Sequence, residues 1–164
     1  AVTVPNLASN TARVRVSCVG NIFFDLSNVN FSITAPLPTG FHTLTPCRLV
    51  DTRDAVGPFG GPALAGGAAR TFAIEGGCGV PPEAIAVAIN VTVVLPTAAG
   101  SLRVYPSGIA PPLISTLNWK ALETRANNAV LGLDGPNAGS LDVFADFLGA
   151  GTAHFLIDVV GYFD

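Results

Sequence analysis

Hydrophobic and polar residues alternate along much of this chain, with the period of two that a half-buried β-strand produces. From residue 41 onward such runs recur at short intervals between Gly- and Pro-rich segments, as they do in β-sandwiches. The predicted strands of this part are 70–75, 85–95, 101–105, 114–119, 128–133, 140–144 and 154–160. Residues 120–127 lack an apolar stripe and allow one helical turn at most. The pattern predicts an all-β fold, an antiparallel, jelly-roll-like β-sandwich with an N-terminal strand-rich extension.

That extension is an apolar arm with its own alternation. A Pro-rich stretch, residues 36–40, ends the arm because proline cannot continue a central strand. The predicted organisation is therefore an arm over residues 1–40 and a sandwich over residues 41–164. The arm has to bury its apolar face either in its own domain or in a neighbour's. The residues predicted to fill a groove there are Val14, Val16, Cys18, Phe24, Val29, Phe31 and Ile33.

Composition narrows the class of protein. The chain is 49% hydrophobic and 12% charged, with a net charge of −3 and 8 scattered basic residues. Such a distribution offers no footprint for a phosphate backbone, so nucleic acid is not an expected partner. The apolar runs are shorter than the ~20 residues that span a bilayer. The chain starts at Ala1 without Met, and we expect a mature, exported protein, extracellular or at the cell surface.

Three cysteines fit an exported protein. Cys47 and Cys78 each lie beside turn residues, where structural bridges are common, and we predict a disulfide between them. Closing that loop stabilises the fold by about 3 to 4 kcal/mol if the entropic account holds. Cys18 is left over on the apolar face of the arm, either as a buried thiol that acts as a small hydrophobe or as half of an intermolecular bridge.

Residues for catalysis or metal binding are scarce. His42 and His154 are the only histidines, and no Gly-x-Ser-x-Gly motif accompanies them, so we predict no enzyme and no catalytic residue. No His/Cys cluster has zinc spacing. Asp142 and Asp146 bracket a predicted turn, and residues 134–137 resemble a calcium loop, but neither has the dense oxygen-ligand spacing of a tight site. We expect no metal and no cofactor.

The densest group of charges surrounds Asp51. Arg48 and Arg53 lie within three residues of it, and alternate spacing can place Asp51 and Arg53 on one face. A structural network of ion pairs and hydrogen bonds is the preferred interpretation, ahead of a ligand site. Residues 54–67, rich in Gly, Pro and Ala, lack periodicity and predict a compact Ω-type loop rather than a lid.

The sequence offers candidates both for binding a sugar and for carrying a covalently attached one. Tyr105, Trp119 and Tyr162 are the candidates for stacking on a bound sugar, although each lies in or beside a predicted strand, where a core or half-buried position is the preferred interpretation. Asn30 and Asn90 begin triplets that match the N-glycosylation acceptor, so the protein can also carry covalent glycans.

Several short motifs between residues 41 and 163 together resemble a β-rich domain of secreted and cell-surface bacterial proteins, often found beside peptidases, amidases or other surface modules. The resemblance implies a fold and a location, and no catalytic residue, and the arm lies outside it. The motifs are Thr45-Pro46-Cys47-Arg48-Leu49-Val50-Asp51-Thr52-Arg53, Cys78-Gly79-Val80-Pro81, Asn90-Val91-Thr92-Val93, Pro96-Thr97-Ala98-Ala99-Gly100, Leu117-Asn118-Trp119, Thr124-Arg125-Ala126-Asn127-Asn128 and Asp158-Val159-Val160-Gly161-Tyr162-Phe163.

Two functions fit these observations. The first is a secreted structural subunit that self-associates into a filament or surface assembly, head to tail, with the arm added as one or more strands to a neighbouring subunit. The second is a carbohydrate- or cell-wall-binding β-sandwich module, which the family resemblance favours.

Overall fold

The computed structural model describes residues 9–17, 24–33, 40–135 and 137–164, and the chain divides into two compact units, residues 1–38 and 39–164. The described residues contain no helix, and so none that could cross a membrane. The strands of the first unit are β1 (Ser9–Ala12), β2 (Arg15–Ser17), β3 (Phe24–Leu26) and β4 (Phe31–Ile33). The strands of the second unit are β5 (Phe41–Asp51), β6 (Leu64–Ala65), β7 (Ala69–Ala73), β8 (Ala86–Val94), β9 (Gly100–Pro106), β10 (Leu117–Trp119), β11 (Arg125–Gly132), β12 (Ser140–Phe147) and β13 (Thr152–Phe163).

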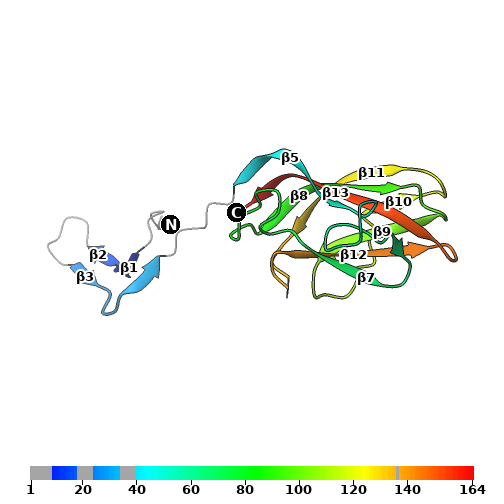
Figure 1. Ribbon diagram of the computed structural model, residues 1–164. Helices are drawn as coiled ribbons and strands as arrows, with labels where there is room; N and C mark the ends of the chain where they lie inside the picture. Colours follow the sequence, from blue (N-terminus) through cyan, green and yellow to red (C-terminus); the bar gives the residue numbers. More distant parts are fainter. Residues whose placement is uncertain (1–8, 18–23, 34–39, 136) are drawn as a thin grey trace. The chain divides into compact units, whose positions relative to one another are not determined.

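Figure 1 shows the strands of the second unit, which, apart from β6, form nested pairs: the first strand pairs with the last, and so on inward. β9 pairs with β10, β8 with β11, β7 with β12 and β5 with β13, all antiparallel. Pairing of β9 with β12 and of β8 with β13 joins these pairs into two sheets, ordered β10-β9-β12-β7 and β11-β8-β13-β5, with β6 beside β13. This is the strand order of a jelly roll. The predicted all-β, jelly-roll-like sandwich is confirmed.

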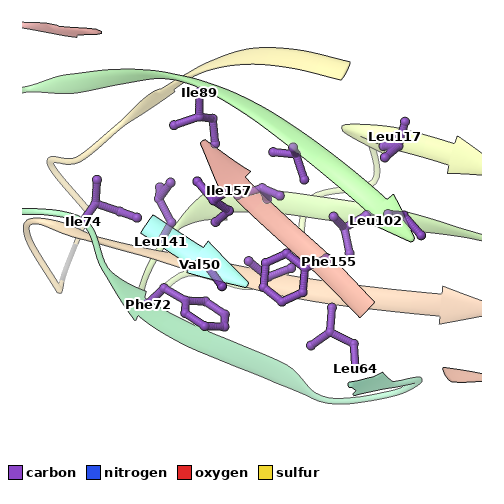
Figure 2. Close-up of a cluster of buried hydrophobic side chains, with 14 of the residues drawn as sticks. Val50, Leu64, Phe72, Ile74, Ile89, Leu102, Leu117, Leu141, Phe155 and Ile157 are labelled. Carbon is purple, nitrogen blue, oxygen red and sulfur yellow. The ribbon is translucent and has the colours of Figure 1, made fainter. Parts of the chain in front are cut away.

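The two sheets enclose one apolar core, which Figure 2 shows in close-up. Successive residues of a strand point to opposite faces, so alternate positions of β8, from Val87 to Val93, are fully buried. Phe72 of β7 and Phe155 of β13 meet edge to face across the sheets, with ring centroids 5.2 Å apart. Such a pair adds about 0.5–1.5 kcal/mol beyond the burial of its surface.

Differences from the predicted strands lie mainly at their ends. β5 was missing from the predicted set, although it is eleven residues long, because its inward and outward positions do not alternate cleanly in hydrophobicity. β10 is shorter than predicted, and β11 starts at Arg125, inside the segment for which a helical turn was allowed. Two register shifts between β5 and β13 account for the broken alternation.

One lateral side of the sandwich is closed by bonds outside the ladders. A disulfide joins Cys47 of β5 to Cys78, as predicted. The loop after β5 returns along the same side, and Asp51 N donates to the Phe59 carbonyl (2.9 Å). The Arg70 guanidinium then donates to the carbonyl oxygens of that loop at Gly57, Gly60, Gly61 and Pro62, over 2.7–3.1 Å. The side of the sandwich between β5 and β7 is therefore covered.

We expect the Cys47–Cys78 bridge to contribute about 3–4 kcal/mol to the free energy of unfolding, because it closes a loop of 31 residues in the unfolded chain. The test is guanidinium unfolding of the wild type and of the Cys47→Ala/Cys78→Ala variant, each with and without reductant. The wild type should lose stability in reductant, and the variant, which retains Cys18, should not respond. Equal stability of the two oxidised proteins would contradict the expectation.

Candidate functional site

The described strands of the arm form a two-stranded antiparallel ribbon. β2 pairs with β3, and β1 pairs with β4. Between these pairs Ser27 N donates to the Val14 carbonyl (2.9 Å) and Val14 N donates to Ser27 Oγ (3.2 Å). Arg13 Nε also reaches the other strand, donating to Asn30 Oδ1 (2.7 Å). An isolated two-stranded ribbon is marginally stable in water.

The ribbon leaves its large apolar side chains in solvent. Val14, Val16, Leu26, Val29 and Phe31 are between 40 and 73% exposed. Val16 lies opposite Asp25 and Leu26 lies opposite Arg15, so the exposed apolar side chains are distributed over both faces of the ribbon. Burial of these residues therefore stays a prediction that needs a partner. Ile33 is half-buried, Phe24 lies in β3, and Cys18 lies outside the described residues.

The sandwich has an uncovered edge at β11. Of the described strands, only β8 pairs with it. In antiparallel pairs directly opposite residues share a face, and Arg125, Asn127, Ala129 and Leu131 lie opposite the buried Val93, Val91, Ile89 and Val87. These four β11 residues thus occupy core-facing positions. Yet Arg125 and Asn127 are exposed, and Ala129 and Leu131 are only half-buried.

A groove runs along this edge, between β11 and residues 104–120. Its apolar end, with a volume of about 410 Å³, is lined by Ala129 and Leu131 and by residues of the loop before β10. Ile109 and Ile114 of that loop are 45 and 77% exposed. Toward Arg125 the lining becomes polar. We call residues 104–120 and 125–131 together the β11 groove.

The middle of the β11 groove is bridged by a side chain. Asn127 Nδ2 donates to the Thr116 carbonyl (2.8 Å), and Thr116 N donates to the Leu102 carbonyl (2.8 Å). At the polar end Arg125 Nη1 donates to Glu123 Oε1 (3.2 Å). A guanidinium carries five N–H donors, so Arg125 can bind a second acceptor.

Two of the three aromatic residues considered for sugar stacking are buried, which removes them as stacking candidates. Tyr105 and Trp119 are 3 and 5% exposed. The Trp119 indole N–H donates to the Ala98 carbonyl (2.9 Å), and its ring meets Phe147 edge to face at 5.6 Å. Tyr162 is half-buried and stacks on His42, with centroids 4.9 Å apart. A ring that packs inside the protein cannot offer its face to a sugar.

Asp51 is the centre of an ion-pair network. Its carboxylate accepts from Arg53 Nε (2.8 Å) and Nη2 (2.6 Å) and from the Arg53 backbone N–H (3.1 Å), and Arg48 Nη1 lies 3.5 Å away. Arg48 also donates to both Asp158 carboxylate oxygens, at 2.8 and 3.2 Å, and so ties β5 to β13. The arginine hydrogen bonds outweigh burial and lower the pKa of Asp51 from 3.8 to about 2.

His154 has no arrangement suited to nucleophilic catalysis. Its Nδ1 lies 2.8 Å from the Thr52 carbonyl and 3.2 Å from Thr52 Oγ1. Because a carbonyl can only accept, Nδ1 carries the proton and cannot take one from the Thr52 hydroxyl. His42 hydrogen-bonds Asp164 (3.0 Å), joining the start of β5 to the end of the chain, and lowers the pKa of Asp164.

The carboxylates considered for calcium do not converge. Asp142 and Asp146 lie four residues apart in one strand, β12, rather than around a turn, so about 13 Å separates them. Asp142 is buried and accepts from Thr71 Oγ1 (2.6 Å) and Ser107 Oγ (2.9 Å), while Asp146 pairs with Arg103. Among the described residues no three His, Cys, Asp or Glu side chains gather as a metal-binding group.

The two glycosylation triplets lie in different settings. Asn30 is exposed in the arm, with its Oδ1 bonded to Arg13 and its Nδ2 free of that contact. Asn90 is half-buried in β8 and donates to Thr92 Oγ1 (3.3 Å). Asn90 is thus held in a central strand, and Asn30 is the more accessible of the two.

No model of a protein family matches this chain, and no curated protein matches it. Two solved structures of the tobacco streak virus coat protein, one described as a dimer, are similar in fold at 12% identity. They have TM-scores of 0.38 and 0.39, cover 78 and 79% of this chain, and are themselves covered to 90%. At these values the similarity carries no argument about function, and the class of fold rests on the strand order alone.

Sequence reasoning missed the β11 groove. The strand after Thr124 begins with Arg125-Ala126-Asn127-Asn128, which is too polar to read as the edge of a core. One signal was available: Ile109, Leu113 and Ile114 are apolar residues in a Pro-rich loop, and Leu113 is 98% exposed. Loops of this kind are normally polar, so exposed apolar side chains in one mark a surface that can be covered.

We expect the Asp51 network to make the free energy of unfolding depend on pH in the acidic range. Because the folded pKa of about 2 lies below the unfolded value of 3.8, the contribution is complete above about pH 4 and disappears as the pH falls toward 2. Chemical unfolding between pH 7 and 2 should show the wild type losing up to about 2 kcal/mol more than Asp51→Asn over the last two units. Asp54→Asn, a change at an exposed carboxylate nearby, is the matched control and should follow the wild type. Parallel curves for Asp51→Asn and the wild type would refute this role.

Proposed function

We propose that the protein is a structural subunit that polymerises head to tail, with its N-terminal arm added as one or more strands to the next subunit. The observation that carries the proposal is the exposure of five large apolar side chains, Val14, Val16, Leu26, Val29 and Phe31, on a two-stranded ribbon. A ribbon of this size has no core of its own. It gains stability when a neighbouring sheet covers the apolar side chains of one of its faces.

The energetics favour strand addition over a loose surface contact. Each Val or Phe moved fully out of water contributes about 1.5–3 kcal/mol. Each backbone hydrogen bond added at a sheet edge contributes about 0.5–1.5 kcal/mol net. These gains have to exceed the cost of association and of ordering the segment, so several apolar residues must dock together.

A contact between the arm of one subunit and the sandwich of the next joins two different surfaces. Such a heterologous contact repeats at every subunit and produces an open filament unless the rotation closes into a ring. We accordingly propose a filament or fibril, with a pilus-like use of a donor strand, rather than a closed dimer. The proposal assigns the protein no enzymatic activity.

The proposed location is extracellular or at the bacterial cell surface. The Cys47–Cys78 disulfide supports it, because structural disulfides persist in oxidising compartments. The sequence motifs that resemble domains of secreted bacterial proteins support it as well. Only 12% of the residues are charged, and a low charge also suits a protein whose surface packs against copies of itself.

The carbohydrate-binding alternative has less support in the structure. Its two best stacking residues, Tyr105 and Trp119, are buried in the sandwich. Tyr162, the third, is already stacked on His42. A sugar site would need exposed rings beside polar groups, and these residues do not provide one.

We expect Phe31→Asp combined with Val29→Asp to abolish assembly, because two carboxylates cannot enter an apolar groove without a large desolvation cost. Electron microscopy and sedimentation velocity of the purified chain at rising concentration measure the effect. Val56→Asp is the matched control, since Val56 is an 82% exposed valine of the sandwich. It should assemble as the wild type does.

A wild-type chain that stays monomeric at high concentration would refute the proposed function. So would filaments of unchanged length from the Val29→Asp/Phe31→Asp chain. Circular dichroism of each variant verifies that the sandwich remains folded.

Covalent glycans are a further part of the proposal, with Asn30 as the preferred acceptor because it is exposed. Peptide mapping by mass spectrometry of the native protein should show added glycan mass on the peptide that contains Asn30-Phe31-Ser32. Recovery of that peptide only in unmodified form would exclude glycosylation of Asn30.

A further inference from the structure

The β11 edge lacks a neighbouring strand, and its core-facing row shows what that neighbour must supply. The row reads Arg125, Asn127, Ala129 and Leu131, from a basic end through a polar position to an apolar end. Each of these side chains stays at least partly exposed, although each lies opposite a buried residue of β8. A strand placed beside β11 would cover them and would bond the unpaired backbone groups of that edge.

The arm contains a matching row. In the structure a bend at Asn28 and Val29 separates β3 from β4. Once residues 25–33 straighten into one strand, one face presents Asp25, Ser27, Val29, Phe31 and Ile33, from an acidic end through a polar position to an apolar end. Asp25 is the only acidic residue before Asp51 in the sequence. The segment has a length of about 30 Å when extended, and the eight residues of β11 span about 26 Å.

We propose that residues 25–33 of one subunit dock in the β11 groove of a second subunit, as a strand parallel to β11. This inference rests on the proposed function and names its acceptor site. Asp25 then lies by Arg125, Ser27 by Asn127, Val29 by Ala129 and Phe31 by Leu131. The Ser27 hydroxyl can take part in the polar bridge that Asn127 makes to the Thr116 carbonyl.

The charges and the apolar side chains decide whether the docked strand runs parallel or antiparallel to β11. An antiparallel strand would place Asp25 at the apolar end, beside Leu131 and Ile109, and Phe31 beside the Arg125 guanidinium. The parallel register pairs unlike charges at one end and buries Val29 and Phe31 at the other. It also covers Ile109 and Ile114, the exposed side chains of the loop that forms the opposite wall.

Charge complementarity extends beyond this pair. Arg13, Arg15 and Asp25 give residues 1–38 a formal charge of +1. Because the whole chain has a charge of −3, residues 39–164 have a charge of −4. Long-range attraction of this sign steers the arm toward a sandwich. Asn30, with its glycosylation triplet, lies on the opposite face of the docked strand from Val29 and Phe31, so a glycan there would point away from the groove.

The occupant is a second copy because the proposed head-to-tail assembly joins the arm of one subunit to the sandwich of the next. Val29 and Phe31 are 73 and 40% exposed, and Ile114 at the groove is 77% exposed. The other lateral side of the sandwich, between β5 and β7, is closed by the disulfide and by the loop bound to Arg70. Of these two sides, the β11 groove is therefore the one that can accept a strand.

Charge reversal tests the register. In full-length chains, Asp25→Arg and Arg125→Asp should each weaken association about tenfold or more, because each places like charges together. The double variant Asp25→Arg/Arg125→Asp should restore association to within about threefold of the wild type. Glu83→Arg repeats the acid-to-arginine change at an exposed position outside the groove and serves as the matched control. Sedimentation measures the association constants, and circular dichroism verifies folding.

The outcomes separate the two levels of the proposal. Absence of wild-type assembly would overturn the proposed function. Assembly that both single reversals leave unchanged, or that the double variant fails to restore, would overturn the β11 register while the subunit function stands. A restored double variant supports both.

Disulfide crosslinking tests directly which residues lie side by side in the assembled subunits. Every chain in this experiment carries Cys18→Ser, so that Cys18 cannot form a competing bridge. One population carries Val29→Cys and another Ala129→Cys, and mixing under mild oxidation should yield a covalent heterodimer of twice 16.7 kDa. Val29→Cys with Arg125→Cys is the control and should not crosslink, because four residues along a strand place the sulfurs about 13 Å apart. Crosslinking of the control to the same extent would overturn the register. A chain that carries both Val29→Cys and Ala129→Cys and closes only within itself would overturn the second-copy occupant.

Discussion

The edges of the two sheets are the constraint on which the rest of this molecule depends. Apart from β6, the strands of the sandwich pair in the nested order of a jelly roll, and this order leaves outer strands at both lateral sides. Between β5 and β7 the Cys47–Cys78 bridge and the carbonyl-bound Arg70 cover the side. At β11 no described strand does so, and core-facing side chains remain in solvent. Unpaired edges invite strand addition, and a protein that keeps one open can use it for assembly.

The sandwich has an edge that lacks a strand, whereas the arm has strands that lack a sheet. The arm carries apolar side chains and strand-forming residues, but two strands cannot build a core. Its exposed Val29 and Phe31 and the half-covered Ala129 and Leu131 of the sandwich are surfaces of the same chemistry, each missing a partner. Assembly by strand exchange satisfies both at once, which is the physical basis of the function proposed for this chain.

Much of the fold could be predicted from alternation alone. β7, β8 and β9 lie within one or two residues of their predicted ends, because their inward positions are almost all apolar. β5 was not among the predicted strands, since its register shifts break the alternation. For Trp119 and Tyr105 the alternation favours a core position over sugar stacking, and the packing shows that both are buried. A predicted strand end at residue 144 placed a turn between Asp142 and Asp146, whereas β12 continues to Phe147 and contains both.

By itself the sequence determined the all-β class, the division into an apolar arm and a sandwich, and the cysteines that form the disulfide. These features are local: a period of two, a Pro-rich break and cysteines beside turns can each be recognised within a few residues. The tertiary structure alone decided which edge stays open and which side chains line it. Arg125 and Leu131 become one row of a groove only when β11 pairs with β8 and residues 104–120 fold alongside. Long-range strand pairing has no local signature, because the partners of a strand are chosen by the whole sheet.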